Sequence, residues 1–241
     1  MSIDIYNLQL KFTFAWSLAA IGLSYFDYHP GLQLIEDLKE IDILSGTRMK
    51  REFPVRLAIE LAYMFGLCAM EVSISYPSPN VPLATVLFVN MYHGFTVLKV
   101  LVDHYTRHIK SVSKRFLVAT DKLKDGDYST AVTVHSKLIS CAAKVTDVFG
   151  LEILLVLSVE SCLIVYNLYN FRSLLESFQK DNKGTSLFIF ISILWLVSWF
   201  SDIWNIVSTT EDMLDQSKTF NESLLKQIIE DSTGELAKNV S

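Results

Sequence analysis

The sequence is poor in the residues that build disulfide-bonded and metal-bound frameworks. Cys68, Cys141 and Cys162 are the only cysteines among 241 residues, and they are widely spaced. Neither a disulfide framework nor a zinc site follows from this spacing, so we expect buried free thiols. His104 and His108 form one H-x-x-x-H pair, but five histidines in all are too few for a histidine-built di-iron centre.

Motifs of enzymatic chemistry are absent as well. The chain has no glycine-rich phosphate loop, no G-x-S-x-G elbow, no protein-kinase motif set and no C-x-x-C pair. The sequence therefore predicts a protein that is not an enzyme, with no catalytic residue, no cofactor and no metal site.

An excess of positive charge is also missing, since the formal net charge is −5. This charge balance argues against nucleic acid as a partner. What the sequence does contain is apolar: 51% of the residues are hydrophobic and 12% are aromatic, and the mean hydropathy is +0.32. These values are too high for an ordinary soluble domain and indicate a membrane protein.

The apolar residues gather in stretches long enough to cross a bilayer, which takes about 20 residues. Five windows qualify, at 10–26, 55–76, 81–102, 147–169 and 186–207. They predict an all-α polytopic helical bundle that forms a single membrane domain over 1–241. Prolines between the second and third windows force a tight reversal. A cleaved signal peptide is the alternative interpretation of the first window, and it would leave four spans.

Basic residues set the expected orientation. The loops 27–56 and 103–146 carry thirteen Lys and Arg, whereas 77–82 carries none and 170–185 carries three. The positive-inside rule then places the amino terminus outside and the carboxyl terminus inside. We expect 103–146 to form a cytoplasmic helical hairpin and 208–241 a cytoplasmic tail. A first helix that starts outside is an unusual beginning, so a preceding span is inferred to be missing.

Several polar side chains fall inside the predicted spans, where they are expensive and indicate a packed bundle. They are Glu71, Asn90, His93, Glu160 and Asp202. For each, hydrogen bonding between helices competes with a role on a ligand or ion path. Glu160 is expected to be protonated or paired, with His93 as a candidate partner. Lys99 is expected to extend toward the inner interface, and Trp195, Trp199 and Trp204 to lie at the interface or face lipid.

Three stretches resemble a known family. Val145–Leu151, which reads V-T-D-V-F-G-L, together with the preceding H-S-K-L of His135–Leu138, resembles the fifth transmembrane helix of insect gustatory receptors. Leu34–Leu44 resembles the loop between helices two and three of these receptors, and Thr210–Leu224 the segment after helix six. On this alignment the five windows correspond to helices two to six.

This resemblance implies a seven-helix chemoreceptor of the plasma membrane, with a cytoplasmic amino terminus and four subunits around a ligand-gated cation channel. The implied partners are a small-molecule tastant, membrane lipid, and further subunits in a homo- or hetero-oligomer. Tastants would bind in the outer half of the bundle, where the candidate ligand-binding residues are Tyr76, Tyr166, Tyr169 and Phe188. An interfacial aromatic belt is the competing interpretation of these four residues.

Two family features are not found in the sequence: the first helix and the pore-lining seventh helix with its Thr-Tyr motif. We therefore expect a truncated receptor that does not conduct by itself. The alternative is a non-conducting membrane interaction protein or modulatory subunit, which ligand-evoked current would distinguish from a channel. A secondary transporter is less favoured because neither inverted repeats nor broken helices are evident.

The predicted orientation can be tested through glycosylation. Asn221 and Asn239 each begin an N-x-S sequon in the tail, and a cytoplasmic tail is not glycosylated. We expect no change in gel mobility when protein from a glycosylating cell is treated with glycosidase. Sugar on either asparagine would reverse the orientation.

Overall fold

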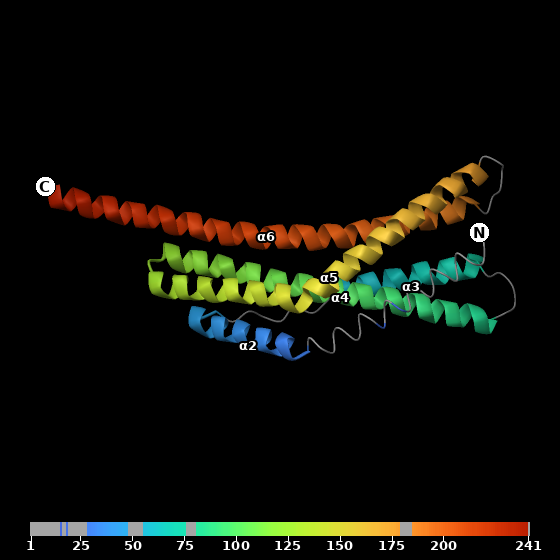
Figure 1. The fold of residues 1–241 in the computed structure, drawn as a ribbon, viewed down its shortest axis with the longest axis horizontal. Coiled ribbons are helices and arrows are strands. Elements are labelled where there is room, and N and C mark those ends of the chain that lie inside the picture. The colour runs from blue at the N-terminus through green and yellow to red at the C-terminus, as the bar shows by residue number, and fades with distance from the viewer. Residues whose placement is uncertain are drawn as a thin grey trace. The chain divides into compact units, whose positions relative to one another are not determined.

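The computed structural model describes residues 28–47, 55–75, 81–178 and 185–240, together with the single positions 15 and 18. In these ranges the chain forms five helices and no strand (Figure 1). They are α2 (Tyr28–Ser45), α3 (Val55–Ser75), α4 (Val81–Lys124), α5 (Tyr128–Phe178) and α6 (Thr185–Val240). The all-α membrane bundle predicted from the sequence is thereby confirmed.

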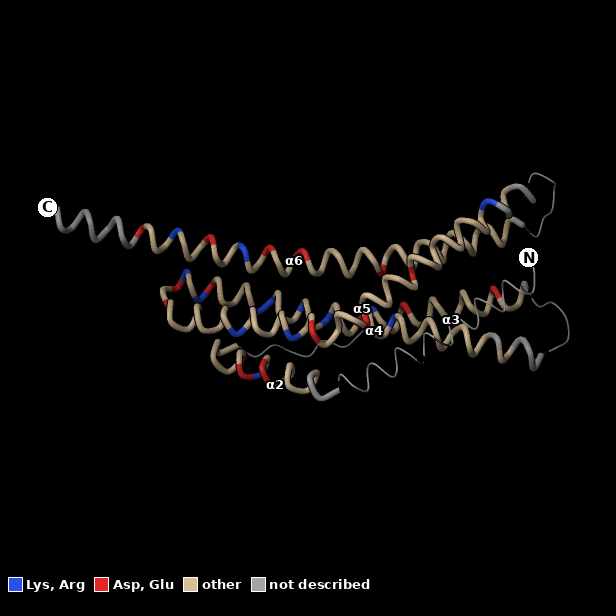
Figure 2. Tube along the Cα trace, in the orientation of Figure 1, with Lys and Arg blue, Asp and Glu red and all other residues tan. Residues whose placement is uncertain are grey.

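Three of these helices are much longer than a bilayer is thick. α4 has 44 residues, α5 has 51 and α6 has 56, which at 1.5 Å per residue corresponds to roughly 65 to 85 Å. The hydrocarbon core is about 30 Å thick. Each helix is therefore long enough to cross the hydrocarbon core and to continue beyond it, and α5 and α6 contain segments apolar enough to do so. Figure 2 shows how the charged residues are distributed along these helices: Lys, Arg, Asp and Glu are frequent in the portions beyond the apolar segments.

The turn between α4 and α5 follows directly from its three residues. Gly126 adopts φ +85°, a left-handed conformation that glycine takes without a steric penalty. The Asp127 N–H donates to the Lys122 carbonyl at 3.1 Å and the Gly126 N–H to the Leu123 carbonyl at 3.2 Å. This Schellman pattern ends α4. Asp127 is the N-cap of α5, because its carboxylate accepts a hydrogen bond from the Thr130 N–H at 3.3 Å.

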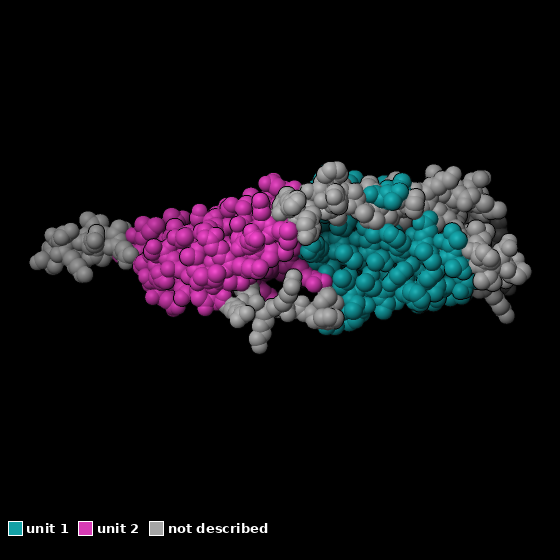
Figure 3. All heavy atoms as spheres, turned by 90° about the horizontal axis from the view of Figure 1, so that it is seen from below, with its two compact units in different colours: residues 1–27, 52–104, 150–205 teal, residues 28–51, 105–149, 206–241 magenta. Residues whose placement is uncertain are grey.

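The residues group into two compact units (Figure 3). Unit 1 comprises residues 1–27, 52–104 and 150–205, and unit 2 comprises 28–51, 105–149 and 206–241. In unit 1, large apolar side chains occur both inside and outside: Leu67 and Phe95 are buried, while Leu154 and Val165 are more than 60% exposed. An apolar exterior of this kind suits a lipid environment.

Tryptophan placement in unit 1 differs in part from the expectation. Trp204 is 73% exposed, as a lipid-facing residue should be, but Trp195 and Trp199 are buried at 4% and 3%. The two buried indoles stack with centroids 5.5 Å apart, and Trp195 also packs on Phe95 at 4.5 Å. Aromatic stacking within the bundle therefore outweighs the interfacial preference at these two positions.

Unit 2 has its own core around an aromatic stack. The His135 ring of α5 lies nearly parallel to Phe220 of α6 at 4.0 Å, with Phe116 of α4 edge-on at 5.4 Å. Both phenylalanines are fully buried, and His135 is 8% exposed. Leu34 of α2 and Leu138 of α5 are also fully buried in this unit. One segment of each of α2, α4, α5 and α6 thus contributes to a core like that of a soluble helical domain.

Ion pairs fasten α2 to the other helices of unit 2. The Asp42 carboxylate accepts hydrogen bonds from Nε and Nη2 of Arg115, each at 2.7 Å. This bidentate geometry strengthens the pair. Glu40 pairs with Lys137 at 2.6 Å, and Asp37 pairs with Lys144. Asp37 and Glu40 are three residues apart and lie on one side of α2, whereas Asp42 is two residues beyond Glu40 and points to another side. Their partners lie on α4 and α5.

The five predicted spans have different outcomes. Among the residues that the structure describes, three helices contain segments long and apolar enough to cross a membrane, Val55–Ile74, Tyr128–Arg172 and Ser186–Glu230. These segments contain or closely match the windows 55–76, 147–169 and 186–207. The window 81–102 forms the first half of α4, which is not among the three, so its crossing remains a prediction. The window 10–26 lies outside the described residues, except for positions 15 and 18.

The Asp42–Arg115 pair yields a stability prediction. Arg115→Gln removes the guanidinium from a site where the two side chains are 7% and 18% exposed, and we expect local opening of α2 to become easier by about 2 kcal/mol. That corresponds to roughly 30-fold faster amide exchange in residues 31–45, measurable by hydrogen–deuterium exchange. The control Lys124→Gln breaks an exposed pair and should change exchange little. Equal exchange in both variants would contradict the prediction.

Candidate functional site

The polar face of α6 is the element on which the candidate sites of unit 1 are built. Trp195, Ser198, Asp202 and Asn205 are all buried at 8% exposure or less. Their spacing of three or four residues places them along one side of the helix. Ser201, the residue before Asp202, is exposed. Partners from α3, α4 and α5 meet this face at two levels.

The first level is an ion cluster of three residues, Lys99, Glu160 and Asp202. Lys99 Nζ lies 2.5 Å from Asp202 Oδ2, with the two side chains 5% and 1% exposed. Glu160 of α5 is 1% exposed and interacts electrostatically with both Asp202 and Lys99. Lys99 is thus buried in the bundle and does not extend to the interface as expected, because its amine pairs with Asp202. The charged neighbours of Glu160 are these two residues, and His93 is exposed.

Next to the ion cluster on α6 is a polar contact with α3. Arg56 donates from Nε to Glu60 at 2.6 Å and from Nη1 to the Asn205 side-chain oxygen at 2.6 Å. Glu60 also acts electrostatically on Asp202. Its side chain is 22% exposed, so the Glu60 carboxylate is less buried than Asp202.

The second level is an aromatic cluster made of Glu71, Tyr166 and Trp195. The Trp195 indole N–H donates to Glu71 Oε2 at 2.8 Å, so the α3 carboxylate has a hydrogen-bond partner within the bundle. The Tyr166 hydroxyl of α5 is buried and, among the described residues, has no hydrogen bond of good geometry; it interacts weakly with the Asn170 side chain and lies near Glu71. This cluster combines flat apolar faces with one carboxylate and one unsatisfied hydroxyl, the combination that small-molecule sites use.

The three predicted ligand-binding residues that the structure describes have different surroundings. Tyr166 belongs to the aromatic cluster, and Phe188 on α6 is half-buried. Tyr169 is 72% exposed, as expected for a residue of an aromatic belt. Tyr76 lies outside the described residues. Of these three, Tyr166 is the residue that lies in the aromatic cluster, close to the candidate polar residue Glu71.

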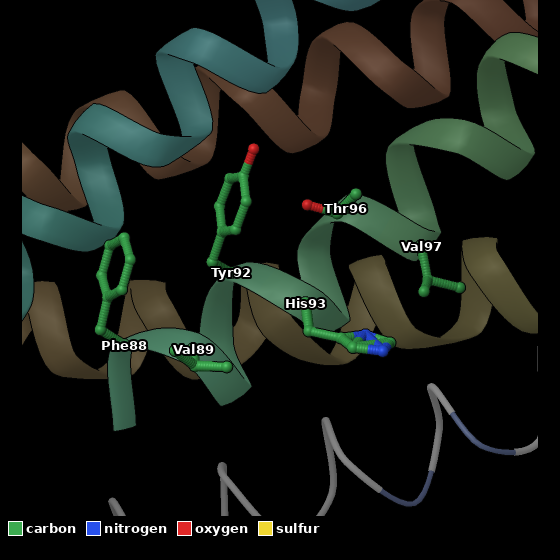
Figure 4. Close-up of a pocket in the computed structure, with 6 residues that line it drawn as sticks. All are labelled: Phe88, Val89, Tyr92, His93, Thr96 and Val97. Atoms are coloured by element: carbon green, nitrogen blue, oxygen red, sulfur yellow. The ribbon is translucent and has the colours of Figure 1, made fainter. Parts of the chain in front are cut away.

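A shallow hollow of about 330 Å³ lies along α4 (Figure 4). Its lining side chains all come from this helix: Phe88, Val89, Tyr92, His93, Thr96 and Val97. Phe88 and Tyr92 point the same way and stack in parallel at 6.0 Å, whereas His93 points to a different side. Asn90 is half-buried on the same helix. An open hollow lined by one helix encloses little of a ligand, so it is a weaker candidate than the aromatic cluster.

Sequence reasoning missed the roles of Lys99 and Trp195. Residue type predicts that Lys99 extends toward the inner interface and that Trp195 lies at the interface or faces lipid, although each has an acidic partner on another helix. A span containing a buried acid needs a donor from a neighbouring helix, and Lys99 and Trp195 were available donors. Within the part of the chain that the structure describes, no group of three His, Cys, Asp or Glu residues could hold a metal ion.

The fold and these clusters define an α-helical membrane protein with buried polar sites between its helices. The chain matches the family described as 7tm Chemosensory receptor over residues 5–234, and it belongs to that family. The resemblance found in the sequence is confirmed at this level, and the family is one of receptors. No curated protein and no solved structure is similar enough to count as a match.

The buried Lys99–Asp202 pair gives a prediction for the stability of unit 1. Lys99→Met leaves two carboxyl groups without their cation, and we expect a loss of about 3 kcal/mol. The double variant Lys99→Met/Asp202→Asn removes both charges and should recover most of that loss, because replacing a complete buried pair is often close to neutral. Thermal unfolding in detergent gives the two values. Additive effects of Lys99→Met and Asp202→Asn would show that the pair is not coupled.

Proposed function

We propose that the protein is a gustatory receptor of the plasma membrane, a subunit of a ligand-gated cation channel that detects tastants. Membership of the chemosensory receptor family supports a receptor role, and the resemblance of Val145–Leu151 to the fifth gustatory-receptor helix supports the narrower assignment. The proposal includes assembly into a homo- or hetero-oligomer, with four subunits by resemblance, in contact with membrane lipid.

The aromatic cluster is the proposed tastant site, and the Tyr166 hydroxyl is the observation that favours it most. A buried hydroxyl without a hydrogen bond is unfavourable by about 1 to 3 kcal/mol. A ligand hydroxyl or amine could satisfy it while Glu71 and the Trp195 ring fix the orientation. Tastants with both apolar and hydrogen-bonding groups, such as sugars and alkaloids, have this chemistry.

A non-conducting modulatory subunit is the second candidate. Leu225, Ile228 and Ile229 on α6 are 55% to 60% exposed, and they lie in unit 2, which the basic loops place in the cytoplasm. Exposed apolar residues on one face of a water-facing helix indicate a partner surface. A ligand-evoked current from cells that express the chain alone, during application of sucrose, fructose, caffeine and quinine, would exclude the modulator, since neither a modulator nor a truncated receptor is expected to conduct by itself.

Tyr166→Ala tests the proposed tastant site. If one of these four compounds binds wild-type protein in detergent, the variant should lose about tenfold in affinity, equivalent to about 1.4 kcal/mol. Tyr169→Ala is the matched control, because it removes the same side chain one turn away at a position that is 72% exposed. Quenching of intrinsic tryptophan fluorescence measures both. Equal affinity of Tyr166→Ala and wild type would remove the aromatic cluster as the site.

A further inference from the structure

The ion cluster contains one more acidic group than it has cations. Lys99 offers a single positive charge, and Asp202 lies 2.5 Å from it. Glu160 stands beside this pair without a cation of its own among the residues described. An ionised carboxylate left unpaired in an apolar interior is strongly unfavourable, and such groups bind a proton instead.

Burial makes this imbalance severe. Lys99, Glu160 and Asp202 are 4%, 1% and 1% exposed, so water does not screen their charges. Neither oxygen of Glu160 has a well-formed hydrogen bond within the described part of the chain. Glu160 interacts with the Asp202 carboxylate, and a hydrogen on one Glu160 oxygen would form a hydrogen bond between the two groups.

The other charged groups near the cluster do not remove the imbalance. From α3, Glu60 acts on Asp202 with the same sign of charge. Arg56 of the same helix is already paired with Glu60 and Asn205. From α4 the cluster receives Lys99, from α5 Glu160 and from α6 Asp202. The sum over these five ionisable groups is two positive and three negative charges, which leaves one negative charge in excess.

We propose that Glu160 and Asp202 form an intramembrane proton-binding site. In this site Glu160 carries the proton and donates a hydrogen bond to Asp202, while Lys99 pairs with Asp202. The proton neutralises the excess negative charge and supplies the missing hydrogen bond. Asp202 remains the ionised member because it contacts the Lys99 amine directly. Release of the proton places two carboxylates beside one amine, so contact among α4, α5 and α6 in unit 1 weakens as the pH rises.

Infrared spectroscopy of the full chain in lipid vesicles tests this assignment. A protonated carboxyl gives a C=O stretching band above the amide I band, whereas an ionised carboxylate does not. We expect such a band at neutral pH in wild-type protein, shifted when glutamate side chains are labelled with carbon-13, and lost in Glu160→Gln. Labelling of aspartate side chains should leave it in place.

Glu60→Gln is the matched control, because it removes a glutamate of unit 1 that already pairs with a cation, Arg56, at 2.6 Å. This variant should keep the Glu160 band. An unchanged spectrum in Glu160→Gln would overturn the proposal. Failure of Glu160→Gln to fold would also overturn it, since glutamine reproduces the shape and hydrogen-bond donor of a protonated carboxyl group.

Thermal unfolding against pH gives a second, independent readout. Proton release favours the unfolded chain, where Glu160 is solvated, so wild-type stability should fall as the pH rises. Glu160→Gln carries no titrating proton at this position and should lose less of its unfolding temperature over the same range. Parallel pH profiles of wild type and Glu160→Gln would contradict the proposal even if the infrared band were present.

Discussion

The burial of charge in an apolar interior is the constraint on which unit 1 depends. Lys99 and Asp202 must be removed from water together, because either alone would carry an uncompensated charge into the bundle. Their 2.5 Å contact therefore fixes the rotation of α4 about its axis against α6. Apolar contacts between lipid-like surfaces are less specific, because leucine packs equally well on a lipid tail or on a neighbouring helix.

The same helices satisfy a different constraint in unit 2. Here the core is His135, Phe116 and Phe220, and the helices are joined by pairs such as Asp42–Arg115 and Glu40–Lys137. The Glu40–Lys137 pair is exposed and adds little stability in water, so the buried side chains of this core contribute more than that pair does. The bidentate Arg115 contact adds direction by fixing where α2 lies on α4.

The helices were predictable, and their side-chain partners were not. Apolar length in 55–76, 147–169 and 186–207 identified segments that the structure contains as long helices, and the turn at Gly126 between α4 and α5 lies within the helical hairpin expected over 103–146. These signals are local, because they depend on composition, hydrogen-bonding capacity and glycine's φ. The partners of Glu71 and Glu160 depend instead on the rotation of separate helices, which a single sequence does not encode in its spacing. Residue type alone therefore assigned Lys99 and Trp195 to the interface, when each is a buried donor.

One continuous helix carries a residue of each candidate site. Trp195 of the aromatic cluster and Asp202 of the ion cluster are seven residues apart on α6, about two turns or 10 Å along the axis. An intact helix of that length moves as a rigid element, so a rotation that turns Trp195 away from Glu71 also turns Asp202 away from Lys99. The two contacts therefore favour the same orientation of α6, and a change in either contact alters the stability of the other.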